Sequence, residues 1–172
     1  MISLVTGGCG FIGSHMVDRL LAEGHEVRVI DNWTTGRPEN LDHQKDNEDL
    51  KIYHMDIRNK EEIAPVFQDV DYIFHFAALA DIVPSIQRPY DYYSSNVLGT
   101  FNVVECAKDA GIRKLVYAAY QANFLQKRRL RSGRSIWHAF KDFRGSVRRI
   151  PCIEACRKAV YRCGRRKQDR YK

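Results

Sequence analysis

The chain has 172 residues, 44% of them apolar, which is enough for one globular domain with a buried core. No apolar run approaches the roughly 18 residues that span a membrane, and the first residues lack the basic start and apolar stretch of a signal peptide. Five cysteines without paired spacing argue against a disulfide framework, so we expect a cytoplasmic protein without membrane contact.

The net charge of +7 is unevenly distributed along the chain. Residues 1–119 hold 11 Lys and Arg against 18 Asp and Glu, whereas residues 120–172 hold 17 against 3. We therefore expect a domain over residues 1–119, followed over residues 120–172 by a basic tail that is irregular or helical.

The acidic part alternates strand and helix patterns. Short apolar runs predict strands at residues 2–6, 26–31, 51–56, 71–76 and 114–118. Apolar residues at helical spacing predict helices at residues 12–22, 61–67 and 90–110, with Gly24 and Gly111 as terminators. Strands that alternate with helices are typical of an α/β fold with a parallel sheet.

A glycine cluster, at residues 6–13, joins the first predicted strand to the first helix. Gly7 would allow a tight turn, Gly10 would let the backbone approach a pyrophosphate, and Gly13 would let helix and strand pack closely. The helix N-terminus offers N–H groups and a positive dipole end to phosphates. The alternative is a glycine turn without a ligand. The position of the glycine cluster between a strand and a helix favours a Rossmann fold that binds a dinucleotide. We expect a doubly wound parallel sheet that is incomplete in this chain.

Asp31 ends the second predicted strand, 18 residues after Gly13. A carboxylate at this place accepts hydrogen bonds from ribose hydroxyls and repels a 2′-phosphate, which favours NAD over NADP. Arg37 weakens this preference, because a nearby Arg can hold a 2′-phosphate. The alternative is that Asp31 only caps a loop.

Several motifs occur together in a shared order and spacing. They are Thr6-Gly7-Gly8-Cys9-Gly10-Phe11-Ile12-Gly13-Ser14-His15, Asp31-Asn32, Asp56-Ile57, Phe76-Ala77-Ala78 and Asn96-Val97-Leu98-Gly99-Thr100. In this combination, residues 1–119 resemble the extended short-chain dehydrogenase/reductase family, in its nucleotide-sugar 4-epimerase and dehydratase branch.

The resemblance implies NAD as the cofactor and assigns residues to it. Backbone N–H groups would bind the pyrophosphate at Phe11 and Ile12. The adenosine ribose would be lined by the segment that contains Asp31, Asn32, Thr35 and Gly36, and the adenine would be flanked by Asp56 and Ile57. The nicotinamide side would be lined by Phe76, Ala77, Ala78 and Leu79. Asn96 would help to order the site from a helix that its apolar neighbours predict to be largely buried. The alternative for Asn96 is a polar residue on a solvated face.

The resemblance also implies a reaction. Such enzymes transfer a hydride from a UDP- or dTDP-sugar to NAD, giving a 4-keto-sugar, and then complete an epimerisation or a dehydration. They use a Tyr base with a Lys four residues later, and a Ser or Thr just beyond the fifth strand. No Tyr of this chain has that Lys, and the residues after Leu115-Val116-Tyr117 are Ala118-Ala119-Tyr120-Gln121-Ala122. We therefore assign no catalytic residue and expect the cofactor-binding portion of such an enzyme, without turnover of its nucleotide-sugar substrate.

Residues 120–172 do not share the resemblance. Three hypotheses could explain these residues. We favour a frameshift or truncation; the others are a functional basic tail and an unfamiliar true domain. The alternative function is therefore a non-catalytic dinucleotide-binding protein whose basic tail binds nucleic acid, a partner that we do not expect. We expect no metal site, because Cys152, Cys156, Cys163 and His138 match no zinc spacing. A sheet that ends after five strands would leave apolar surface uncovered, which predicts self-association.

Overall fold

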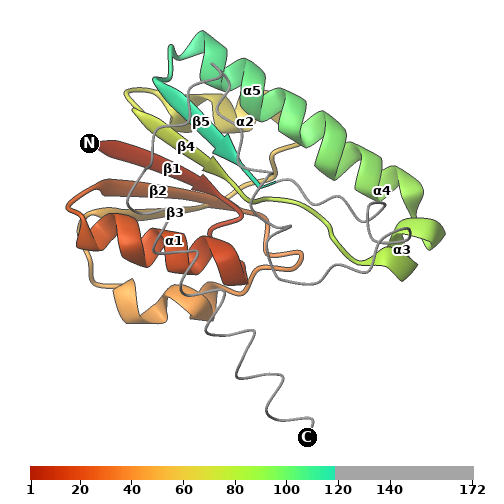
Figure 1. Ribbon diagram of the computed structural model, residues 1–172, viewed down its shortest axis with the longest axis horizontal. Helices are drawn as coiled ribbons and strands as arrows, with labels where there is room; N and C mark the ends of the chain where they lie inside the picture. The colour runs from red at the N-terminus through yellow and green to blue at the C-terminus, as the bar shows by residue number, and fades with distance from the viewer. Residues whose placement is uncertain (119–172) are drawn as a thin grey trace, which may run out of the picture.

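The computed structural model describes residues 1–118, in which five parallel strands form one sheet (Figure 1). The strands are β1 (Ile2–Thr6), β2 (Glu26–Asp31), β3 (Leu50–His54), β4 (Tyr72–His75) and β5 (Lys114–Tyr117). Their order is β3-β2-β1-β4-β5, so the direction of winding reverses between β1 and β4. The expected doubly wound parallel sheet is confirmed. The basic tail predicted over residues 120–172 lies outside the described residues.

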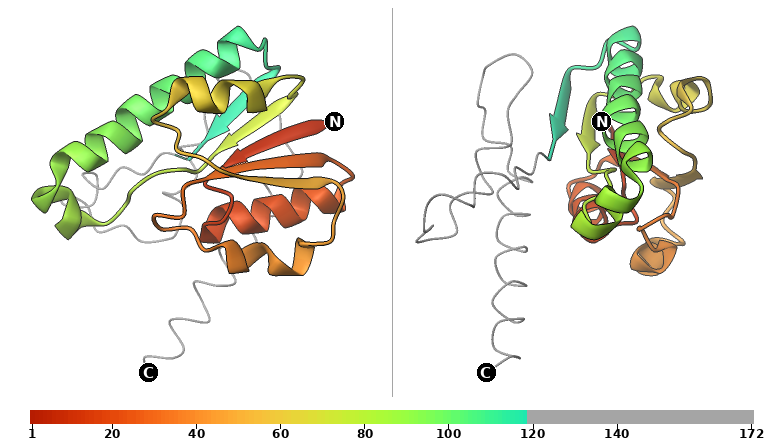
Figure 2. Two further views of the ribbon diagram at one scale, coloured as in Figure 1. Left: turned by 180° about the vertical axis from the view of Figure 1, so that it is seen from behind. Right: turned by 90° about the vertical axis from the view of Figure 1, so that its right-hand side faces the viewer.

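Helices cover both faces of the sheet (Figures 1 and 2). On one face lie α1 (Phe11–Ala22) and the 3₁₀ helix Pro38–Gln44. On the other lie α2 (Lys60–Ile63), the 3₁₀ turn Ala64–Phe67 and α5 (Thr100–Asp109). Successive side chains of a strand point to opposite faces, so in β1 Leu4 packs toward α5 and Val5 toward α1. Both are fully buried, and so are the two polar residues of β1, Ser3 and Thr6, because the central strand is covered on both faces.

Three predicted elements differ from the structure by more than one residue at an end or in the type of helix. The strand expected at residues 51–56 ends at His54, so Met55 and Asp56 lie in the loop that follows. The helix expected at residues 61–67 is α2 followed by a 3₁₀ turn. Pro65 explains the change, because its ring lacks an N–H and would clash with the carbonyl four residues earlier in a continuous α-helix.

The helix expected at residues 90–110 is three consecutive segments, α4 (Pro89–Tyr93), a π-helical stretch Ser94–Gly99 and α5. It is preceded by α3 (Ile82–Gln87), which the sequence did not predict. The expectation that this helix is largely buried is wrong for its first half, where Tyr90 is 74% and Val97 is 54% exposed. The first half extends past the carboxyl ends of the strands and has no sheet beneath it, whereas α5 packs on the sheet through buried Val103 and Cys106 (Figure 1). Within residues 1–118 no helix is long and apolar enough to cross a membrane.

Candidate functional site

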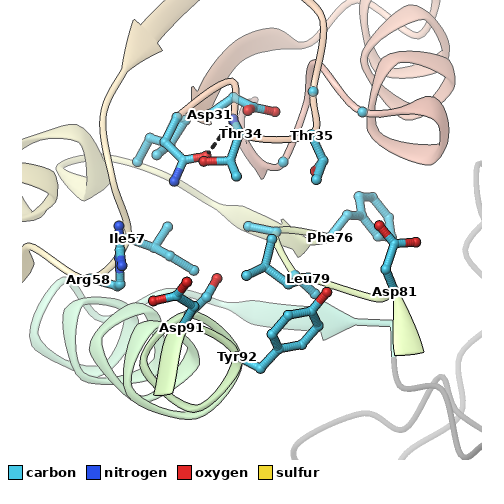
Figure 3. A pocket seen from close by; sticks show the side chains of 18 of the residues that line it. Asp31, Thr34, Thr35, Ile57, Arg58, Phe76, Leu79, Asp81, Asp91 and Tyr92 are labelled. Atoms are coloured by element: carbon cyan, nitrogen blue, oxygen red, sulfur yellow. Dashed lines mark hydrogen bonds between the residues drawn. The ribbon is translucent and has the colours of Figure 1, made fainter. Parts of the chain in front are cut away.

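A cavity of about 480 Å³ opens at the carboxyl ends of the strands, at the point where the sheet reverses between β1 and β4 (Figure 3). Its wall is built from the loop after β1, the turn after β2, the segments after β3 and β4, and helices α3 and α4. Crevices at this topological position are where open parallel sheets bind ligands, and the volume suits a small molecule.

The loop between β1 and α1 forms one wall of the cavity. Gly7 has a φ of 71°, and a Cβ added there would lie 2.6 Å from the backbone N of Ala77. A side chain at this position would therefore push the ends of β1 and β4 apart. A Cβ on Gly13 would lie 2.7 Å from Cα of Gly8, so the close contact of α1 with the loop also requires glycine.

The N-terminus of α1 follows directly from this loop. Its N-cap is Gly10, which has no side chain to accept hydrogen bonds from the first turn. The helix therefore keeps N–H groups available for an anion beside the cavity. The side chains of Phe11 and Ile12 are exposed and do not line the cavity, so any contact of these two residues with a ligand there would be through the backbone.

The carboxylate of Asp31 lies between this loop and the turn after β2. It is buried, and it accepts hydrogen bonds from the backbone N–H of Cys9 (2.9 Å) and of Trp33 (2.8 Å). Gly36 lies against it, since a Cβ on Gly36 would be 2.6 Å from Oδ2 of Asp31. Because each carboxylate oxygen has two lone pairs, the carboxylate can still accept hydrogen bonds from hydroxyl groups in the cavity.

Asp56 does not line the cavity, but Ile57 and Arg58, which follow it, do. Its carboxylate accepts hydrogen bonds from Nδ2 of Asn32 (3.0 Å) and from Nη2 of Arg58 (2.6 Å). The hydrogen-bonded Arg58 guanidinium lowers the pKa of Asp56 to about 2, so this carboxylate is ionised. Asp56 therefore orients Asn32 and Arg58, and these two side chains are the ones that face the cavity.

The segment after β4 supplies Phe76, Ala77, Ala78 and Leu79 to the wall. Asn96, in the π-helical stretch, reaches this segment from behind. Its Oδ1 accepts a hydrogen bond from the Leu79 N–H, and its Nδ2 donates one to the Leu79 carbonyl, both at 2.8 Å. Asn96 thus fixes the backbone of a lining residue without lining the cavity itself.

His75, at the end of β4, is buried directly behind the same wall. Its Nδ1 is 2.5 Å from Oγ1 of Thr6, and its Nε2 is 2.9 Å from Oγ1 of Thr100. Burial lowers the pKa of His75 to about 4, so the imidazole is neutral near pH 7. One ring nitrogen then donates a hydrogen bond and the other accepts one, and the ring links β1, β4 and α5.

Most of the residues expected at the site line this one cavity. They are Gly7, Gly10, Asp31, Asn32, Thr35, Gly36, Ile57, Phe76, Ala77, Ala78 and Leu79. The remaining ones, Phe11, Ile12, Gly13, Asp56 and Asn96, lie beside or behind it.

Other lining residues were not expected from the sequence. They are Ile30, Met55, Arg58, Asp81, Pro84, Arg88, Asp91, Tyr92 and Ser95. Thr34, which also lines the cavity, belongs to the segment of residues 31–36 that was expected there. Arg58 could have been found, because it directly follows the Asp56-Ile57 motif. Those on α3 and α4 come from a helical segment that reaches the cavity only because it overhangs the strand ends, and no local pattern signals this.

Known proteins are similar to this chain in architecture and in sequence. Residues 3–122 match the NAD dependent epimerase/dehydratase family. The chain is 37% identical over 113 residues to UDP-glucuronic acid decarboxylase 1 of Danio rerio, covering 66% of this chain and 26% of that protein. It is 36% identical over 123 residues to UDP-glucose 4-epimerase of Bacillus subtilis, covering 69% of this chain and 36% of the relative.

Solved structures of nucleotide-sugar epimerases and dehydratases are also similar to this chain. A UDP-glucose 4-epimerase of Thermus thermophilus in complex with NAD matches with a TM-score of 0.60 and 38% identity, over 67% of this chain and 36% of that one. A dTDP-glucose 4,6-dehydratase of Streptomyces venezuelae with bound NAD matches with a TM-score of 0.64 and 39% identity, over 67% and 38%. The chain therefore spans about a quarter to two fifths of the length of these relatives.

Proposed function

This chain belongs to the NAD dependent epimerase/dehydratase family, and on that basis we propose that it binds NAD in the crevice between β1 and β4. The observation that carries the proposal is the meeting of three features at one cavity. These are the uncapped N-terminus of α1, the ordered carboxylate of Asp31, and the small side chains of Ala77 and Ala78.

The residues of the crevice fit a dinucleotide from end to end. Backbone N–H groups at the start of α1 would hold the pyrophosphate, and Asp31 would accept hydrogen bonds from the ribose hydroxyls. Ile57 would contact the adenine, and Ala77 and Ala78 leave room for the nicotinamide ring. When bound, NAD supplies an acceptor for a hydride.

The carboxylate of Asp31 also favours NAD over NADP. It is buried and ordered by two N–H groups, so a 2′-phosphate placed beside it would meet an uncompensated negative charge. Arg37, six residues later in the sequence, is exposed and is a cation that could oppose this preference.

The substrate class that we propose is a nucleotide sugar, by analogy with relatives named for UDP-glucose, UDP-glucuronic acid and dTDP-glucose. In this scheme the chain supplies the cofactor-binding portion. We expect the 172-residue chain to bind NAD without turning over a nucleotide sugar, since none of its Tyr residues has a Lys four positions later. Cys9 and Cys106, the two cysteines of the described part, are buried free thiols, which supports our proposal of a reducing, cytoplasmic location.

Thermal unfolding of the purified chain tests the proposal. NAD should raise the melting temperature, because it binds the native crevice and not the unfolded chain. NADP should raise it less, because its 2′-phosphate would lie beside the Asp31 carboxylate. Asp31→Arg should abolish the rise with NAD. An equal rise with NAD in the variant would refute the proposed ribose site. Conversion of UDP-glucose to UDP-galactose by the purified chain would refute the expectation that it has no turnover.

A further inference from the structure

Residues 31–36, the turn after β2, contribute to the cavity with a single exception. Asp31, Asn32, Thr34, Thr35 and Gly36 all line it, whereas Trp33 does not. Trp33 has a φ of 56°, in the left-handed region that favours glycine. Its backbone conformation thus turns the largest side chain of the segment away from the crevice.

The Trp33 side chain stacks on His54, the last residue of β3. Their ring centroids are 3.8 Å apart and their planes differ by 9°. His54 is also the register partner of Asp31 in the sheet, so the stack sits directly beside the strand ends from which the turn departs. An unfavourable backbone conformation persists only where surrounding contacts hold it, and this stack is one contact of the Trp33 side chain, which also hydrogen bonds with the Cys9 thiol.

The backbone of Trp33 connects this stack to the proposed ribose site. Its N–H is one of the two backbone donors that hold the Asp31 carboxylate, at 2.8 Å. The next N–H, that of Thr34, donates to Oδ1 of Asn32 at 3.1 Å. A change to a negative φ at Trp33 would leave its own N–H in place, because that N–H lies in the peptide plane before the rotated bond. It would redirect the chain that follows, and with it Gly36, which lies against the Asp31 carboxylate.

We propose that Trp33 and His54 act together as positioning residues for the adenosine half of the cofactor. This inference rests on the proposed function. The stacked pair holds Trp33 in its left-handed conformation, and that conformation directs the residues after it along the cavity. Among them, Gly36 lies against the Asp31 carboxylate and thereby helps to place it for the ribose hydroxyls. Neither Trp33 nor His54 lines the cavity.

The test is a calorimetric titration of the full 172-residue chain with ADP, a probe for the adenosine half, and with NAD. Trp33→Gly and His54→Ala should each weaken ADP and NAD binding about three- to tenfold, the range expected for the loss of one aromatic pair. Trp33→Phe and His54→Phe keep two stacked rings and should stay close to wild type. Ile52→Ala, at a 40% exposed position on the same strand, is the matched control and should bind like wild type.

Two further readouts separate positioning from general stabilisation. Glycine relieves the left-handed backbone, so Trp33→Gly should melt close to the wild-type temperature while it loses affinity. The double variant Trp33→Gly/His54→Ala should bind ADP no more weakly than either single variant, because both remove the same pair.

The outcomes are distinct for the two proposals. Wild-type affinity in Trp33→Gly and His54→Ala, or losses that simply add in the double variant, would overturn the inference and leave the proposed function standing. If the wild-type chain binds neither ADP nor NAD, the inference and the proposed function are both overturned.

Discussion

Oδ2 of Asp31 accepts a hydrogen bond of 2.9 Å from the backbone N–H of Cys9, which joins the ribose side of the crevice to the glycine-rich loop. The two ends of the proposed dinucleotide site are therefore not independent. A change that moves the Asp31 carboxylate also affects the loop that precedes α1. Cys9 itself is buried beside this carboxylate, and burial, together with the charge of Asp31, raises the pKa of its thiol to about 11.

Gly36→Ala should weaken NAD binding about tenfold with little loss of stability. The new Cβ would lie 2.6 Å from Oδ2 and 2.7 Å from Oδ1 of Asp31, so the carboxylate must move. Gly24→Ala is the control, because its Cβ meets no atom within 4 Å but its φ of 78° is unfavourable for Ala. It should cost about 1–2 kcal/mol of stability and leave affinity unchanged. Calorimetry and urea unfolding of both variants measure the contrast, and an unaffected affinity in Gly36→Ala would count against the Asp31 assignment.

His75 should make the domain less stable at acidic pH. Its folded pKa of about 4 lies below its ordinary value of 6.5, so the unfolded chain binds the proton more readily. The contribution of neutral His75 to the free energy of unfolding is therefore fully present well above pH 6.5. It is lost as the pH drops toward 4, by about 3 kcal/mol in total.

Urea unfolding at several pH values measures this dependence. His75→Gln should be less stable at pH 7, since it disturbs the bonds to Thr6 and Thr100. It should also lose about 3 kcal/mol less than wild type between pH 6.5 and 4. The same slope in both proteins would show that His75 is not the group responsible.

Asn96→Ala should loosen the segment after β4. It removes both hydrogen bonds to the Leu79 backbone and leaves an N–H and a carbonyl half-buried without a partner, at a cost of about 1–3 kcal/mol. Hydrogen exchange at the Leu79 amide should become faster, as measured by NMR. Asn59→Ala, at an exposed position whose side chain bonds only Glu62 at 3.1 Å, should leave that amide protected. Equal protection of Leu79 in Asn96→Ala would argue against a positioning role.

The exposed apolar side chains between α3 and the start of α5 should make the chain self-associate with a second copy. They recur at helical spacing, with Ile86, Tyr90, Tyr93 and Phe101 all more than half exposed. Sedimentation at increasing protein concentration should show a growing share of dimer, and Tyr93→Glu/Phe101→Glu should reduce it. A wild-type chain that stays monomeric at high micromolar concentration would contradict this expectation.

The sequence predicted the parts of the fold that depend on local patterns. The run of β1, the glycine cluster and the end of β2 at Asp31 are contiguous in sequence, and each carries its own apolar period or turn residue. The 3₁₀ helix Pro38–Gln44 was missed because Leu41 is the only residue that it buries, which leaves no period to detect.

The rest of the site depends on contacts between distant segments. Asn96 and Leu79 are 17 residues apart, and their paired hydrogen bonds follow from the path of α3 and α4 around the cavity. The left-handed Trp33 was equally hidden, because glycine, and not tryptophan, is the residue that signals such a conformation. Propensity and spacing therefore identify the sheet and the phosphate loop, and tertiary packing decides which side chains complete the crevice.

Binding of NAD by the 172-residue chain, measured by calorimetry, tests the central claim most directly. We predict binding of one NAD per chain, weaker binding of NADP, and a loss of NAD affinity of at least tenfold in Asp31→Asn, since hydrogen bonds to charged groups contribute about 1.5–3 kcal/mol. Asp18→Asn, a surface carboxylate on α1, should bind NAD like wild type. No detectable heat with wild type, or equal affinity in wild type and Asp31→Asn, would contradict the assignment of this crevice to NAD.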